Sequence, residues 1–201
     1  ETLRQPLCFD ELVGRGFGPQ EHPTSVTHSP GNGDWSTAMS GHVMRGGTHF
    51  VEFAITDFEK YMQCIILGVI RPVSLIEGID MEDDWEGSVN PLTVLSRSRY
   101  KTVVPEKLRC QRTAKWRNSH VHCCAYFCYN GDCICTDWNN EQDYSDWQGS
   151  EGLGGSGTIG LLLDLNEGTL SVFKNGRRLG VMKDGLGGEY VWFVSVCPAC
   201  T

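Results

Sequence analysis

The clearest fold signal lies in residues 157–192, which read GTIGLLLDLNEGTLSVFKNGRRLGVMKDGLGGEYVW. Three runs of strand length lie here, and short turn sequences separate them. The pair Asn175-Gly176 is typical of a type I′ turn, because both central residues of that turn need a positive φ. In the preceding turn, the short side chains of Asp164 and Asn166 can hydrogen-bond the backbone. The stretch therefore predicts consecutive β-hairpins whose glycines serve the turns.

Strand signals of the same kind continue outward from this stretch. Further strands are expected at residues 49–55, 64–70, 121–129, 133–138 and 191–196. The run 64–70 is apolar almost throughout, which is typical of a strand buried on both faces. No segment shows a long apolar period of about 3.6 residues, the signature of an amphipathic helix. The sequence therefore predicts an all-β fold, most simply a sandwich of two antiparallel sheets.

The composition excludes some classes of partner and indicates the state of the cysteines. The chain has 201 residues, of which 40% are hydrophobic, and its net charge is −8. No nucleic-acid partner is expected, because phosphate binding requires a basic surface. No membrane contact is expected either, because the longest apolar run, residues 65–70, is too short to cross a bilayer. Ten cysteines in a chain long enough to bury a core predict free thiols and an intracellular, cytoplasmic location.

The domain organisation follows from where the strand pattern begins and where it is interrupted. Residues 1–34 precede it and are interpreted as an N-terminal extension, and residues 35–201 are interpreted as one sandwich. Within the sandwich, residues 73–119 form a long charged insertion with six acidic residues in its first half and eight basic residues in its second. The two halves either neutralise each other on a solvated surface or form a bipolar surface for a charged partner.

The motifs of the chain resemble the SPRY domain family. The resemblance rests on the strand ending in Leu163-Asp164, the strand ending in Lys174-Asn175-Gly176, the Leu179-Gly180 strand start, and residues 39–44, 50–53 and 68–72 upstream. It covers residues 35–196, and Thr158 stands where the family often has aspartate. It implies a bent, concanavalin-like jelly-roll sandwich without catalytic machinery or cofactor. It also implies a module that binds a peptide or protein through loops at one end, as the substrate-recognition part of a ubiquitin ligase or as a scaffold.

The residues expected to contact such a partner are aromatic and cationic side chains near loops, because these dominate interface energetics. They are Arg71, Pro72, Trp85, Trp138, Trp147 and Tyr190. Arg71 has the strongest claim, since a cation that directly follows a buried run seldom has only a packing role. Trp192 lies within an apolar strand and is assigned to the core.

Several cysteines surround a hairpin predicted at Asn130-Gly131. A two-residue loop there would place Cys128 opposite Cys133, which makes them a candidate redox pair and the chain a redox-responsive module. The side chains expected on one sheet face are those of His122, Cys124, Cys128, Cys133 and Cys135. No metal is expected, because neighbours along one strand face are widely spaced for tetrahedral closure. Packing as small hydrophobes is the plainest interpretation.

The alternative function is a carbohydrate-binding or glycan-active sandwich. The carboxylate pairs Asp137/Glu141 and Asp143/Asp146 lie in a Trp-rich segment that could contact a sugar. The GxGxxG spacing at 152–157 lacks the preceding strand and following helix of a dinucleotide site, and the CxxC at 197–200 has no second cysteine pair. The sequence predicts, first of all, a non-enzymatic module for a protein or peptide ligand; it does not indicate the oligomeric state.

Overall fold

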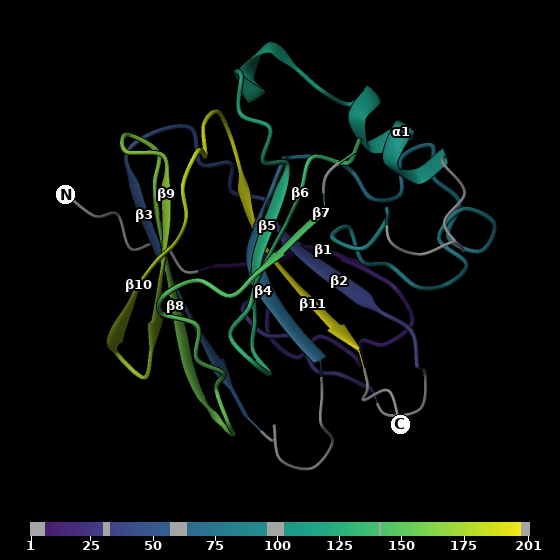
Figure 1. Cartoon of the computed structure of the whole chain (residues 1–201). Helices are drawn as coiled ribbons and strands as arrows, with labels where there is room; N and C mark the ends of the chain where they lie inside the picture. The colour runs from purple at the N-terminus through teal and green to yellow at the C-terminus, as the bar shows by residue number, and fades with distance from the viewer. Residues whose placement is uncertain (1–6, 30–32, 57–63, 96–102, 141, 198–201) are drawn as a thin grey trace.

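The computed structural model describes residues 7–29, 33–56, 64–95, 103–140 and 142–197. Its strands form two antiparallel sheets (Figure 1). The larger sheet has the order β1 (Phe9–Val13), β2 (Ser36–Ser40), β11 (Val191–Cys197), β4 (Cys64–Ile70), β5 (Cys123–Phe127), β6 (Cys133–Thr136), β7 (Gln142–Ser145). The smaller sheet has the order β10 (Arg177–Lys183), β9 (Thr169–Lys174), β8 (Gly157–Asp164), β3 (Thr48–Ile55). The predicted two-sheet all-β fold is confirmed.

The hairpins predicted at residues 157–183 form β8, β9 and β10 of the smaller sheet. Asn175 and Gly176 have φ values of 48° and 78°, as the turn between β9 and β10 requires. At the other end of β9, the carboxylate of Asp164 accepts backbone hydrogen bonds from Asn166 and Glu167 at 2.9 and 3.0 Å. Local turn chemistry therefore determines this part of the fold.

The principal core lies between the two sheets. Leu161 and Leu163 of β8 and Val172 of β9 belong to one buried cluster with Val69 of β4 and Trp192 of β11. These side chains alternate along each strand with residues on the opposite face, so each sheet contributes one apolar face. The assignment of Trp192 to the core is confirmed by its burial.

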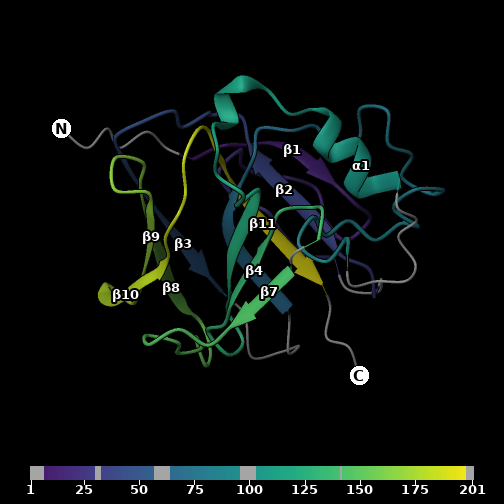
Figure 2. The ribbon, with the colours of Figure 1, turned by 45° about the horizontal axis from the view of Figure 1, so that its top comes forward.

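A second core lies on the outer face of the larger sheet. The segment interpreted from sequence as a charged insertion covers this face, and it contains α1 (Val103–Cys110) and a short 3-10 helix (Ala114–Trp116). Both views show α1 beside the larger sheet, on the side away from the smaller sheet (Figures 1 and 2). The described part of the segment is therefore a structural layer of the domain.

This covering layer is anchored by large aromatic side chains. Trp85 and Trp116 are fully buried in one cluster with Ile70 of β4 and Phe193 of β11. The indole N–H of Trp85 donates a 2.7 Å hydrogen bond to the carbonyl of Leu75, so its polar atom is satisfied inside the core. Burial of two tryptophans explains why a segment rich in charge still packs on the sheet.

The charged residues of the same segment lie at its surface. Lys107 of α1 forms an ion pair with Asp84 at 2.6 Å, which joins the basic half of the segment to the acidic half. Three of the eight basic residues, Arg97, Arg99 and Lys101, lie outside the described residues. Within the described part of the chain, no helix is both long and apolar enough to cross a membrane.

Candidate functional site

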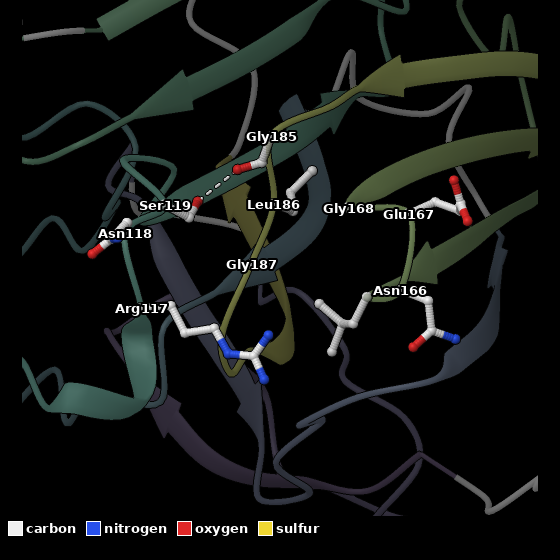
Figure 3. A pocket seen from close by; sticks show the side chains of 10 residues that line it. Arg117, Asn118, Ser119, Asn166, Glu167, Gly168, Gly185, Leu186 and Gly187 are labelled. Atoms are coloured by element: carbon white, nitrogen blue, oxygen red, sulfur yellow. Dashed lines mark hydrogen bonds between the residues drawn. The ribbon is translucent and has the colours of Figure 1, made fainter.

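Three loops meet at one end of the sandwich and line a pocket of about 520 Å³ that is open to solvent. We call it the loop pocket. It is lined by Arg117, Asn118, Ser119, Leu165, Asn166, Glu167, Gly168, Gly185, Leu186 and Gly187. Figure 3 shows Arg117 and Asn118 on one side and Asn166 and Glu167 on the other. Cationic, anionic and amide residues therefore line the same pocket.

Hydrogen bonds to backbone carbonyls hold these loops together. The hydroxyl of Ser119 donates to the carbonyl of Gly185 at 2.7 Å, and the N–H of Leu186 donates to the carbonyl of Gly168 at 3.0 Å (Figure 3 draws the first). Gly168 has a φ of 71°, and a Cβ there would lie 2.7 Å from the carbonyl oxygen of Leu186. Glycine is therefore required where the loops after β8 and β10 approach each other.

Arg71 lies beneath the loop pocket, at the end of β4, and is fully buried. One guanidinium nitrogen, Nη1, donates to the carbonyls of Gly187 and Glu189 at 2.7 and 3.1 Å, and Nη2 donates to the carbonyl of Ser119 at 3.2 Å. Gly187 and Ser119 both line the pocket. A single buried cation thus ties two of the three pocket loops to the larger sheet.

Aromatic rings complete the surroundings of this guanidinium. Its central carbon lies 4.2 Å from the ring centre of Tyr190 and 5.4 Å from that of Trp116, distances typical of cation–π contacts. Burial lowers the pKa of Arg71, yet arginine stays charged at any pH where proteins fold. The hydroxyl of Tyr190 donates to the carbonyl of Val121 at 2.7 Å. Arg71 and Tyr190 therefore support the pocket from below.

Four of the six residues expected from sequence to contact a partner lie in the interior. Arg71, Trp85, Trp138 and Tyr190 are fully buried, so in this conformation they offer a partner no surface. The reason is that large aromatic and guanidinium groups fill the second core and the base of the pocket. The structure places all four in the interior.

The other two expected contact residues are half-buried and lie apart from the pocket lining. Pro72 follows Arg71 at the end of β4. Trp147 packs against the principal core, and its indole N–H donates to the carbonyl of Gly131 at 2.8 Å. Neither lines the loop pocket, and their contact with a partner stays a prediction.

His122 lies beside the buried arginine, between two tryptophans. Its ring centre is 5.0 Å from that of Trp116 and 5.5 Å from that of Trp138. Burial, followed by the charge of Arg71, lowers the pKa of His122 to about 4. The neutral imidazole is thus the form that fits this site, although sequence placed His122 on the opposite sheet face with the cysteines.

The depressed pKa predicts acid-sensitive stability. Because His122 binds a proton more weakly when folded than when unfolded, its contribution is present above about pH 6.5 and is lost as pH falls toward 4. The full loss is about 3 kcal/mol. We expect His122→Phe, which keeps an aromatic ring, to flatten the fall in unfolding free energy between pH 6.5 and 4. Urea unfolding across this range checks it, and an equal slope in both proteins would contradict it.

The cysteine hairpin forms with a different register from the one predicted. Cys124 is paired with Cys135 and Tyr126 with Cys133, so Cys128 is not the cross-strand partner of Cys133. The predicted two-residue loop is wrong because Cys128 belongs to other contacts: its N–H donates to the carbonyl of Ile65 at 2.9 Å. The predicted grouping of Cys124, Cys128, Cys133 and Cys135 on one face agrees with their shared burial between the sheets.

The residues that the sequence offers for a glycan, nucleotide or metal site lie in different parts of the chain. Trp138 is buried and cannot stack on a sugar, and Glu141 lies outside the described residues. Asp143 is exposed on β7. The CxxC at 197–200 extends beyond the described residues, and the glycine-rich run at 152–157 leads directly into β8. None of these placements gives a specific observation in favour of a glycan site.

Sequence reasoning missed the residues that line the pocket, above all Arg117, Asn118, Asn166 and Glu167. Turn signals were visible at residues 166–168 and 184–185, and Arg117 belonged to the basic half-segment. Which turns share one end of a sandwich depends on strand order, and local turn chemistry does not encode strand order. Successive hairpin turns of an antiparallel sheet lie at alternate ends, so the turns that follow β8 and β10 could have been placed at the same end from sequence. This signal could have found the pocket residues that belong to those two turns.

Comparison with known proteins identifies solved structures with a similar fold. No protein-family model and no curated protein matches the sequence. The crystal structure of the TRIM65 PSpry domain is similar, with a TM-score of 0.53, 14% identity, and coverage of 98% of this chain and 91% of that one. The crystal structure of a human SPRY domain gives a TM-score of 0.50 and 12% identity, over 94% of this chain and 96% of that one. The two-sheet fold of this chain is therefore that of the SPRY domain.

Proposed function

We propose that this chain is a non-enzymatic module that binds a peptide or a protein segment at the loop pocket. The observation that carries the proposal is the pocket itself, whose loops are tied to the sheet by the buried guanidinium of Arg71. Loops held on a rigid scaffold are the usual location of binding residues. The SPRY fold supports a protein-interaction module in general.

The lining of the pocket suits a polar, extended ligand. Arg117 offers a cation, Glu167 an anion, and Asn118 and Asn166 offer amide donors and acceptors. Exposed backbone at Gly185 can approach a ligand closely because glycine has no side chain. Such a mixture matches the alternating donors and acceptors of a peptide backbone, with a charged side chain nearby.

Arg117→Glu is expected to weaken partner binding about tenfold, because it reverses the charge at the pocket wall while leaving the buried supports intact. Proximity labelling in cells with wild type and variant would first identify proteins whose labelling depends on Arg117. Peptides from those proteins would then be titrated against the purified chain by fluorescence anisotropy.

The matched control is Arg177→Glu, at the hairpin turn on the opposite end of the smaller sheet. Arg177 is exposed and forms an ion pair with the surface carboxylate of Glu151, so its replacement has a small effect on stability. The variant should retain wild-type binding. Equal loss of binding in both variants, or none in Arg117→Glu, would refute a ligand site at the loop pocket.

A more specific proposal concerns the identity of the bound protein. It is a ubiquitin-ligase substrate or a scaffold component, as the sequence resemblance implies. The family resemblance supports this proposal, which does not depend on where the ligand binds. In the labelling experiment, ubiquitin-ligase subunits should be labelled equally by wild type and Arg117→Glu, while substrates should depend on Arg117. Absence of ligase subunits from both sets would remove the ligase alternative and leave the scaffold alternative and the pocket proposal standing.

A further inference from the structure

Three thiols converge in the principal core, away from the loop pocket. They belong to Cys124 of β5 and to Cys133 and Cys135 of β6, all buried. The Sγ atoms of Cys124 and Cys133 are 3.8 Å apart, and those of Cys133 and Cys135 are 3.5 Å apart. All three sulfur atoms lie within 4.8 Å of one another.

These separations match those around a tetrahedral thiolate-bound metal. A Zn–S bond of about 2.3 Å places two sulfur ligands of one zinc ion roughly 3.8 Å apart. Sequence reasoning expected residues along one strand face to be too widely spaced for this. The side chains of Cys133 and Cys135 instead lean toward each other, so their sulfur atoms are closer than the backbone spacing suggests.

The local charge also suits a divalent cation. Three thiolates and one Zn²⁺ carry one net negative charge, and a buried unpaired charge is strongly unfavourable. Partial burial lowers the pKa of Lys183, at the end of β10, but attraction to negative charge on the three cysteines outweighs it and raises that pKa. Its ammonium group can therefore offset the remaining negative charge. The complete group of three thiolates, one zinc ion and one ammonium is therefore neutral.

We propose that Cys124, Cys133 and Cys135 form a site for one thiophilic divalent cation, Zn²⁺ in the cell. Binding replaces three thiol protons, which pass to solvent, by three S–Zn bonds, and no electron is transferred. In the described part of the chain, no other His, Cys, Asp or Glu belongs to the cluster. Water or a small exogenous ligand therefore takes the fourth position.

The test uses the purified chain, reduced with a phosphine and dialysed against Zn²⁺. We expect one Zn²⁺ per chain, a higher thermal midpoint on binding, and an ultraviolet thiolate-to-metal band when Cd²⁺ replaces Zn²⁺. Cys135→Ser should weaken Zn²⁺ binding at least about tenfold, because even loss of an outer-shell partner of a zinc ligand weakens binding that much.

Two control variants separate this site from other thiols. Cys128→Ser removes a thiol that is buried in the same core but outside the cluster, and Cys200→Ser disrupts the CxxC at 197–200. Both should bind Zn²⁺ as wild type does. Loss of binding in Cys200→Ser with retention in Cys135→Ser would assign the zinc to the CxxC and overturn the proposal.

A measurement on the wild-type chain keeps the proposal testable if a cysteine variant does not fold. X-ray absorption of the zinc-loaded chain should show three sulfur neighbours at about 2.3 Å and one lighter neighbour. Fewer than three sulfur neighbours, or no zinc retained by the folded, reduced chain, would contradict a site at Cys124, Cys133 and Cys135.

Discussion

Replacing Arg71 with leucine is expected to lower the free energy of unfolding by about 3–5 kcal/mol, because three buried or part-buried carbonyls would each lose a donor at a cost of about 1–3 kcal/mol. The guanidinium donates to the carbonyls of Ser119, Gly187 and Glu189, and leucine would leave all three without this donor. It would also remove the contact with the face of Tyr190. Chemical denaturation at neutral pH measures the loss.

Two variants control for this effect. Arg71→Lys keeps a positive charge but not the planar fork, so its loss should be smaller than that of Arg71→Leu. Arg177→Leu removes an arginine whose side chain is 62% exposed and whose ion-pair partner, Glu151, is also exposed, and it should change stability by less than about 1 kcal/mol. If Arg71→Leu were as mild as Arg177→Leu, the buried arginine would not be a structural support.

The position of Arg71 also decides how binding experiments should be interpreted. Because it lies beneath the loop pocket, its removal should disturb the loops that carry Ser119 and Gly187. Lost binding in an Arg71 variant would therefore report a changed pocket shape. Arg117, which lines the pocket itself, is the sharper probe of a ligand contact.

Trp85→Ala is expected to lower the free energy of unfolding by about 3–5 kcal/mol. Trp85 is fully buried on the outer face of the larger sheet, so alanine would leave a large cavity there. The carbonyl of Leu75 would also lose the indole N–H that donates to it at 2.7 Å. Thermal and urea unfolding of the purified variant measure the effect.

The size of this effect tests whether residues 73–119 are part of the domain. Trp147→Ala is the matched comparison, because Trp147 is only half-buried, and its cost should be lower. Trp85→Phe should fall between alanine and wild type, since it fills much of the volume. A cost below about 1 kcal/mol for Trp85→Ala would mean that the segment folds apart from the sheet.

The cysteine hairpin is a case in which a local sequence rule predicts the wrong strand register. Asn130-Gly131 is a strong local signal for a two-residue loop, yet β5 ends at Phe127 and β6 begins at Cys133. The carbonyl of Cys128 accepts a 2.8 Å hydrogen bond from Leu153, far along the chain. Backbone pairing with distant segments overrides the local turn preference and shifts the register by two residues.

Arg71 and Trp85 illustrate the same limit for the candidate site. Arginine and tryptophan are enriched both at interfaces and, when their polar atoms find partners, in protein interiors. Residue type and neighbouring sequence therefore cannot separate the two roles. The distinction depends on whether another part of the chain covers the side chain, and the outer face of the larger sheet does so for Trp85.

By itself, the sequence determined the all-β class, the β8–β9–β10 hairpins and the burial of Trp192. Alternation and turn residues such as Asn175-Gly176 act over a few positions, so these features are local. Only the tertiary structure decided that Arg117, Glu167 and Gly187 share one pocket and that three thiols meet between the sheets. Strand order and side-chain packing bring these residues together from distant positions, and no short-range pattern encodes those contacts.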